Sequence, residues 1–228
     1  MRSLALVLLA GCSTTRALAP LEKGQHGATF SVGGPFVQFA GAPIPLPIAS
    51  VGYQYGIDGK SNVHGAFYLT QLVLFKVGGF DVGINRELSP AAGARPRVMV
   101  DFTNYLFFGD HSPGDPAGGA RWFPDVSLML TWDLGQRPHR IYLGVDTFFQ
   151  TMPEFHVYPS PVLGTELRAS HVVGVQLELA YHAFWADTEP LQPVWYGFDR
   201  HGAIAFKLGL NVYVPTHRAH RKGEEASP

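Results

Sequence analysis

The chain has 228 residues and a formal net charge of −1, with 17 lysines and arginines against 18 aspartates and glutamates. This balance excludes the basic surface that nucleic-acid binding requires, so we expect no nucleic-acid partner. Charged residues make up only 15% of the chain, whereas average soluble proteins carry about 25%. Because an ordinary water-facing surface would be short of charge, the composition favours a body that faces lipid.

The N-terminus has the pattern of an export signal. Arg2 supplies a positive charge, and Leu4 to Leu9 form an apolar run that is too short to span a bilayer. The tetrapeptide Leu9-Ala10-Gly11-Cys12, which contains the only cysteine, resembles the lipobox of bacterial lipoproteins. This resemblance implies a signal peptide over residues 1–11 and acylation of Cys12 as the first mature residue. An ordinary secretory peptide cut elsewhere is the alternative.

Residues 12–27 have no hydrophobic period, and we expect them to form a poorly ordered tether behind the lipid anchor. From Ala28 to Val214, apolar residues recur at every second position, which is the period of a β-strand. Glycine or proline interrupts most windows that could form a helix. The sequence therefore predicts an all-β domain over residues 28–214, followed by a polar tail over 215–228.

The connections between the predicted strands alternate in length along the chain. Asp58-Gly59 is a hairpin dipeptide, whereas Gly109 to Phe123, Ala186 to Arg200 and the irregular stretch Thr70 to Lys76 are longer. This alternation is typical of barrels with short periplasmic turns and long external loops. We predict a closed antiparallel up-and-down β-barrel of about ten strands, eight at the least. In this pattern the chain resembles bacterial outer-membrane barrel proteins, which implies an outer-membrane location with the Cys12 lipid on the periplasmic side.

The less apolar face of the predicted strands is assigned to the lumen. In a water-soluble barrel it would carry many lysines and glutamates, but here it is mainly small, with about one charged group per strand. We expect a structural polar network in which Glu178 and Lys207 form a cross-strand ion pair. The predicted lumen residues are Asp81, Asp101, Asp133, Asp146, Glu166, Glu178, His182 and Lys207.

Catalytic motifs are missing from the sequence. There is no His-Glu-x-x-His, no Gly-x-Ser-x-Gly, no P-loop and no dinucleotide fingerprint. We therefore predict no catalytic residues, no metal site and no cofactor. Glu178 and His182 share one strand face, and the alternative is that they act as an acid-base pair in the lumen.

Three functions are compatible with these features. The first is a non-enzymatic barrel, embedded among membrane lipids, whose long loops contact a surface protein or glycan through Trp195 and Tyr196. The second is a soluble, lipid-tethered carrier of an apolar ligand, similar to a lipocalin. The third is a barrel enzyme that acts on outer-membrane lipid. We favour the first, because the long loops carry aromatic residues and the sequence holds no catalytic set.

Overall fold

The computed structural model describes residues 16–39, 42–109, 119–135, 139–151, 155–187 and 195–214. This part of the chain consists almost entirely of strands, with one short helix, α2 (Leu69–Phe75). The strands are β1 (His26–Phe39), β2 (Ala42–Pro45), β3 (Ile48–Gly56), β4 (Ser61–Tyr68), β5 (Gly78–Ser89), β6 (Arg97–Gly109), β7 (Gly119–Leu134), β8 (His139–Gln150), β9 (His156–Arg168), β10 (Val173–Asp187) and β11 (His201–Val214).

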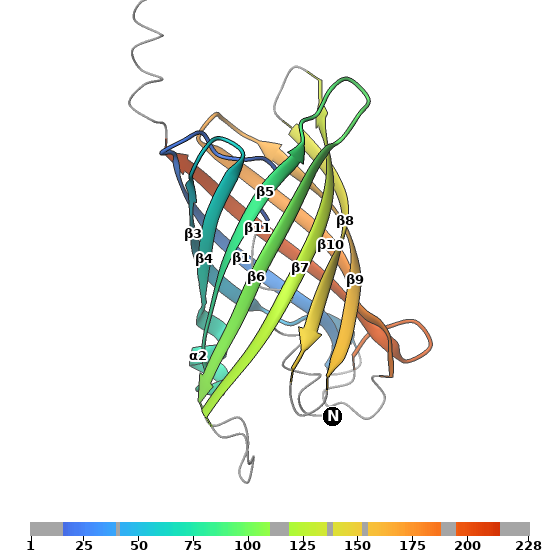
Figure 1. Cartoon of the computed structure of the whole chain (residues 1–228). Coiled ribbons are helices and arrows are strands. Elements are labelled where there is room, and N and C mark those ends of the chain that lie inside the picture. The colour runs from blue at the N-terminus through green and yellow to red at the C-terminus, as the bar shows by residue number, and fades with distance from the viewer. Residues whose placement is uncertain are drawn as a thin grey trace, which may run out of the picture.

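The strands form one closed antiparallel barrel, which confirms the predicted fold. The strands of the wall pair with their neighbours in chain order, and β11 pairs with β1 to close the sheet. The closing register runs from His26 opposite Val214 to Pro35 opposite Ala205. Of the eleven strands, β2 pairs only with the end of β1, so ten form the wall. Figure 1 shows the inclined strands of this wall.

The two rims of the barrel differ in the length of their connections. The turns between β3 and β4, β5 and β6, β7 and β8, and β9 and β10 lie at one end, which we call the short-turn rim (Figure 1, top). The connections that include β2, α2 and the segment between β10 and β11 lie at the opposite end, the long-connection rim. The predicted alternation of connection lengths is therefore present, with one exception: the β8–β9 connection has five residues, fewer than the seven of the β5–β6 turn.

The β3–β4 turn shows how the sequence sets a short turn. Gly59 has a φ of +79°, and the carboxylate of Asp58 accepts hydrogen bonds from the backbone N–H groups of Lys60 (2.9 Å) and Ser61 (2.7 Å). Both bonds lower the pKa of Asp58, and the bond from Lys60 has the larger effect. The turn is thus held by its own side chain, as Asp-Gly turns commonly are.

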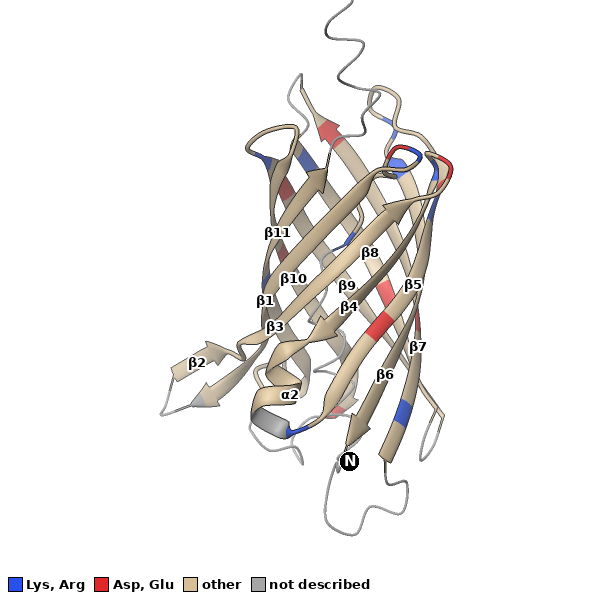
Figure 2. Ribbon diagram, turned by 90° about the vertical axis from the view of Figure 1, so that its left-hand side faces the viewer, with Lys and Arg blue, Asp and Glu red and all other residues tan. Residues whose placement is uncertain are grey.

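Side chains alternate between a polar interior and an apolar exterior. On β3, Val51 and Tyr53 are about half exposed on the outer face, whereas Ser50 and Gln54 are buried in the lumen. On β11, Leu208 is exposed and Asn211 is buried. Figure 2 shows that most of the wall carries neither acidic nor basic residues. This is the reverse of the arrangement in a water-soluble protein.

The connection after β4 is a helix, which corrects the expectation of an irregular loop over Thr70 to Lys76. Helix α2 ends at Phe75, and the next residue, Lys76, has a left-handed φ of 57°. The hydroxyl of Thr70 accepts a bond from the N–H of Ala49 and donates one to the carbonyl of Pro47, both at 2.8 Å, which fastens the helix to the start of β3. No helix among the described residues is both long and apolar enough to cross a membrane.

The segment before β1 lies inside the barrel, although we expected a poorly ordered tether. Leu18 and Leu21 are buried, and the N–H of Leu21 donates to the Asn62 side chain at 2.8 Å. Gly24 then bonds to Gly56 at the short-turn rim, and β1 begins at His26, two residues before the predicted start. Residues 16–25, which we call the inner segment, therefore run from mid-lumen to this rim. The predicted Cys12 lies outside the described residues.

An aromatic cluster fills the other half of the lumen, toward the long-connection rim. Tyr68 stacks on Phe107 with ring centroids 5.7 Å apart, and Phe123 packs against Phe148 at 5.3 Å. These residues lie near the strand ends at this rim, and all four are buried. The inner segment and the aromatic cluster together occupy the barrel along its length.

Candidate functional site

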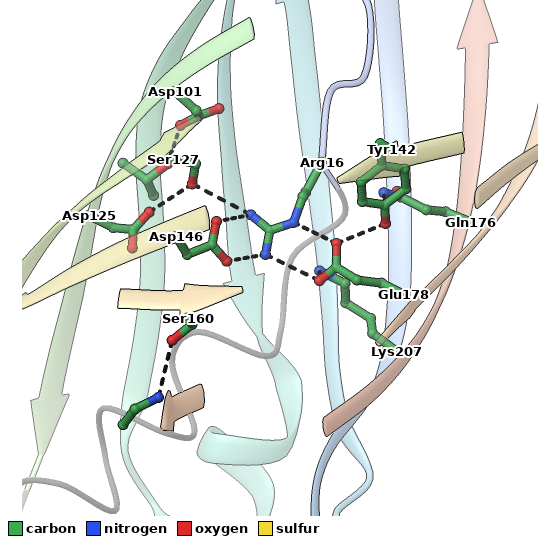
Figure 3. A network of polar contacts seen from close by, with 12 residues as sticks. Arg16, Asp101, Asp125, Ser127, Tyr142, Asp146, Ser160, Gln176, Glu178 and Lys207 are labelled. Atoms are coloured by element: carbon green, nitrogen blue, oxygen red, sulfur yellow. Dashed lines mark hydrogen bonds and ion pairs between the residues drawn. The ribbon is translucent and has the colours of Figure 1, made fainter. Parts of the chain in front are cut away.

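The centre of the lumen is organised around the guanidinium group of Arg16, which comes from the inner segment. Nη1 of Arg16 donates to Oδ1 of Asp146 (2.5 Å), and Nη2 donates to Oδ2 of the same carboxylate. On the other side, Nε and Nη2 donate to the two oxygens of Glu178, at 2.5 and 3.2 Å. Nη1 also reaches Oγ of Ser127 at 3.5 Å. All five N–H donors of the arginine therefore have acceptors, as Figure 3 shows.

The barrel holds the Glu178 carboxylate in place from its other side. Lys207 on β11 lies opposite Glu178 in the strand register, and its Nζ is 2.9 Å from Oε1. The hydroxyl of Tyr142 donates to Oε2 at 2.8 Å, and the side-chain amide of Gln176 donates to the Tyr142 oxygen at 2.8 Å. The predicted Glu178–Lys207 ion pair is therefore present, within a larger network than the sequence suggested.

A second polar cluster lies on β4, β5 and β6. Nε2 of His64 is 3.0 Å from the Asp101 carboxylate, which also accepts a bond from the hydroxyl of Thr103 at 2.6 Å. Nδ1 of His64 faces Asp81 at 3.9 Å, and the hydroxyl of Tyr68 donates to Asp81. Both predicted lumen aspartates thus lie inside the barrel, where they share one histidine.

Two small cavities lie beside the inner segment. One has a volume of about 20 Å³ and is lined by Ala17, His64, Asp81 and Asp101, among others. The other has a volume of about 30 Å³ and is lined by Arg16 and Asp125, among others. Volumes of this size hold a water molecule or two, and their polar walls can hydrogen-bond to it. These cavities are too small for a carried lipid or another apolar ligand.

A chain of alternating charges lines the short-turn rim. Arg97 pairs with Glu87 (2.8 Å) and Asp133 (3.3 Å), and Arg140 pairs with Asp133 (2.9 Å) and Glu166 (2.9 Å). Glu166 is buried and also binds Arg168 at 3.0 Å. The prediction for Glu166 agrees with this position. Asp133 was also predicted to face the lumen. It lies at the end of β7, and its side chain is partly exposed at the rim.

Glu178 and His182 do not form an acid-base pair. Both are buried on the inward face of β10. They are four residues apart on an extended strand, however, and this spacing corresponds to about 13 Å. The Glu178 carboxylate is occupied by Arg16, Tyr142 and Lys207 instead.

The two loop residues proposed as partner contacts have different surroundings. Trp195 is only 5% exposed, forms a β-bridge with Val37 and packs in the aromatic cluster, so it is a core residue and not a surface contact. Tyr196 is 51% exposed, and the nearby Phe198 is also exposed. The pairing of the loop with the end of β1 explains why the tryptophan is buried.

The chemistry of this lumen is that of paired charges. Across the ranges that the structure describes, no group of three or more His, Cys, Asp or Glu side chains is arranged to hold a metal ion. At the centre, the charges of Arg16 and Lys207 balance those of Asp146 and Glu178. The arrangement can orient and neutralise charge, and the two cavities described beside it are too small for a lipid substrate.

Comparison with known proteins adds no family. No protein-family model and no curated protein sequence matches the chain. Among solved structures, the translocator domain of the autotransporter NalP from Neisseria meningitidis has a TM-score of 0.46 and 8% identity, over 86% of this chain and 90% of that one.

Two further barrels are less similar. The outer-membrane protease OmpT from Escherichia coli has a TM-score of 0.32 and 11% identity, over 84% and 94% of the two chains. The attachment invasion locus protein Ail of Yersinia pestis, solved with a heparin analogue, has a TM-score of 0.29 and 10% identity, over 84% and 99%. At these values the likeness is no guide to what the chain does.

Several residues of the site were not predicted, among them Tyr142, Asp125, His64 and Arg16. Tyr142 and Asp125 could have been found, because strand alternation places them on the same face as Gly144 and Ser127. His64 lies on β4, which the sequence pattern did not single out as a strand. No periodic signal marks Arg16, since the inner segment has no regular structure.

Proposed function

We propose that this protein is an integral outer-membrane β-barrel with a closed lumen, which has no enzymatic activity and interacts through its long-connection rim. The observation that carries the proposal is the inverted distribution of polarity, with an apolar outer wall around a polar, filled interior.

The outer wall supports a lipid environment. Leucine and phenylalanine side chains that are about half exposed recur on the outward positions of neighbouring strands, among them Phe102, Leu128, Leu163 and Leu179. Alternation of lipid-facing apolar and lumen-facing polar residues is characteristic of transmembrane barrels. Closure of the wall also leaves none of its ten strands without a neighbour on either side, and hydrocarbon does not tolerate an unpaired strand edge.

The filled lumen argues against the carrier. A lipocalin-like protein needs an apolar cavity inside and a polar surface outside, and both features are inverted here. The two cavities described above have volumes of about 20 and 30 Å³, and the residues facing them are largely polar or charged. The inner segment and the aromatic cluster likewise argue against an open pore.

The lipid anchor at Cys12 is part of the proposal. The lipobox Leu9-Ala10-Gly11-Cys12 supports it, and the anchor would hold the chain to the periplasmic leaflet. A Cys12→Ser variant separates the anchor from the barrel. Membrane fractions should retain the variant after carbonate extraction, because the wall itself is embedded, and release as a soluble monomer without detergent would contradict the integral barrel.

The interaction role is supported by side chains at the long-connection rim. Tyr196 and Phe198 are 51% and 68% exposed, and Phe198 packs edge-on against Tyr181 with centroids 5.4 Å apart. Exposed aromatics near a rim suit contact with a surface protein or a glycan. The barrel enzyme is the weaker alternative, because Glu178 and His182 are separated and the carboxylate is fully occupied.

The decisive experiment asks which strand face meets lipid. In the Cys12→Ser background, single cysteines replace Leu179 and Ala169, and each carries a spin label in reconstituted bilayers. Leu179 faces outward in mid-wall, whereas Ala169 is an exposed residue of the β9–β10 turn. We expect the label at 179 to collide with dissolved oxygen and to be shielded from an aqueous nickel chelate, and the label at 169 to show the opposite. Free access of the chelate to both labels would refute the proposal.

A further inference from the structure

We propose that the acidic pocket around Arg16 is a guanidinium-binding site, with Arg16 as its intramolecular ligand. When the inner segment withdraws, the pocket accepts an arginine side chain supplied in trans. This inference concerns the barrel interior and goes beyond the proposed role of the outer rim.

The acceptor geometry selects a guanidinium group. Asp146 and Glu178 each offer both carboxylate oxygens to one edge of the planar guanidinium group. The hydroxyl of Ser127 accepts the remaining N–H. A guanidinium group presents five donors in one plane, whereas a lysine ammonium has only three on a point-like centre. A lysine at this position could not satisfy both carboxylates in the same way.

The barrel holds these acceptors independently of the inner segment. Glu178 is held by Tyr142 and Lys207, and Tyr142 is held in turn by Gln176. Because these groups lie on β8, β10 and β11, the acceptors should remain in place when Arg16 leaves. A pocket that is organised in advance binds its ligand with a smaller ordering cost.

The charge inside the lumen also favours a cationic ligand. Without Arg16, Lys207 alone would face the buried carboxylates of Asp146 and Glu178, which leaves one negative charge unbalanced. Such an excess of negative charge in a region of low dielectric attracts a cation strongly.

The inner segment is held in a way that allows exchange. It forms no strand within the lumen, and its backbone is bonded to the wall at Leu21, Gly24 and Gln25, near the short-turn rim. The two cavities beside Arg16 and Ala17 show that it does not fill the lumen tightly. A second peptide with an arginine followed by apolar residues would reproduce its contacts.

The test uses the full chain with Cys12→Ser and Arg16→Ala, folded in detergent micelles. We expect N-acetylarginine amide to raise the melting temperature in a saturable way. It should bind at least about tenfold more tightly than N-acetyllysine amide, a difference of about 1.4 kcal/mol. A synthetic peptide with the sequence of residues 15–22 should bind more tightly than the amide if the natural ligand is a peptide, and equally if it is a small guanidine. The chain with Arg16 intact should show a much smaller rise in melting temperature, because Arg16 competes for the pocket, and the Arg16→Ala, Asp146→Asn double variant should show none.

A second measurement keeps the proposal testable if Arg16→Ala does not fold. In the Cys12→Ser chain with Arg16 intact, Ala17→Cys reports exposure of the inner segment to a water-soluble thiol reagent. We expect the arginine-containing peptide to speed labelling several-fold, and its Arg→Lys counterpart to leave the rate unchanged. Equal effects of the arginine and lysine ligands in either assay, or no effect of both, would overturn the guanidinium site.

Discussion

Replacement of Arg16 by alanine is the most direct test of how the lumen is stabilised. The substitution leaves Asp146 and Glu178 without their shared cation, and both carboxylates are more than 90% buried. Removing one partner of a buried ion pair typically costs about 3–5 kcal/mol. A typical domain has a total stability of about 5–15 kcal/mol. We therefore expect Arg16→Ala to lose about 3–5 kcal/mol, a large part of the stability of the barrel.

Urea unfolding of the Cys12→Ser chain in detergent or lipid vesicles, followed by tryptophan fluorescence, measures this loss. Lys23→Ala is the matched control, because Lys23 belongs to the same inner segment but is exposed. It should change the free energy of unfolding by no more than about 0.5 kcal/mol. Asp146→Asn added to Arg16→Ala should recover at least about 1 kcal/mol, because one of the two stranded charges is removed. Equal stabilities of the Arg16→Ala and Lys23→Ala variants would refute the reasoning.

Three further substitutions test the packing of the lumen by the same unfolding measurement. Tyr142→Phe removes the hydroxyl that binds Glu178 and should cost about 1–3 kcal/mol, whereas an unchanged midpoint would mean that this bond contributes nothing. Gly164→Ala places a Cβ 2.4 Å from the Tyr142 ring and 2.5 Å from a backbone carbonyl, and should cost about 1–3 kcal/mol, so a neutral result would disprove the close approach. Trp195→Ala should cost about 3–5 kcal/mol and Tyr196→Ala less than about 0.5 kcal/mol, because only the tryptophan is buried. A larger loss for Tyr196→Ala than for Trp195→Ala would contradict the assigned burial.

Strand periodicity was sufficient to predict the wall. On β10 and β11 the alternation of apolar and polar residues placed Glu178 and Lys207 on the same inward face, and the register brings them opposite each other. The prediction succeeded because a strand has only two faces, and one of them here is consistently apolar. It was less accurate for Asp133, since alternation indicates a face but not the depth within the barrel.

Features that depend on contacts between distant segments were not predictable in this way. Arg16 enters the lumen because closure of the barrel brings two acidic side chains together there, and nothing in its own neighbours indicates this. Trp195 was assigned to an exposed loop because its local sequence is irregular, but its bridge to Val37 buries it. Helix α2 has only seven residues, too few for a helical period to stand out.

The distance along the chain between Arg16 and its partners has a consequence for folding accuracy. The arginine and Glu178 are 162 residues apart in sequence, so their contact can form only when the barrel is almost complete. A slip of β10 by one residue in either direction would turn Glu178 toward lipid and leave the arginine facing a leucine, Leu177 or Leu179. A misaligned barrel is therefore destabilised twice, by a charge in hydrocarbon and by an unpaired cation in its lumen. The pocket around Arg16 therefore favours the correct register of the strands that form it.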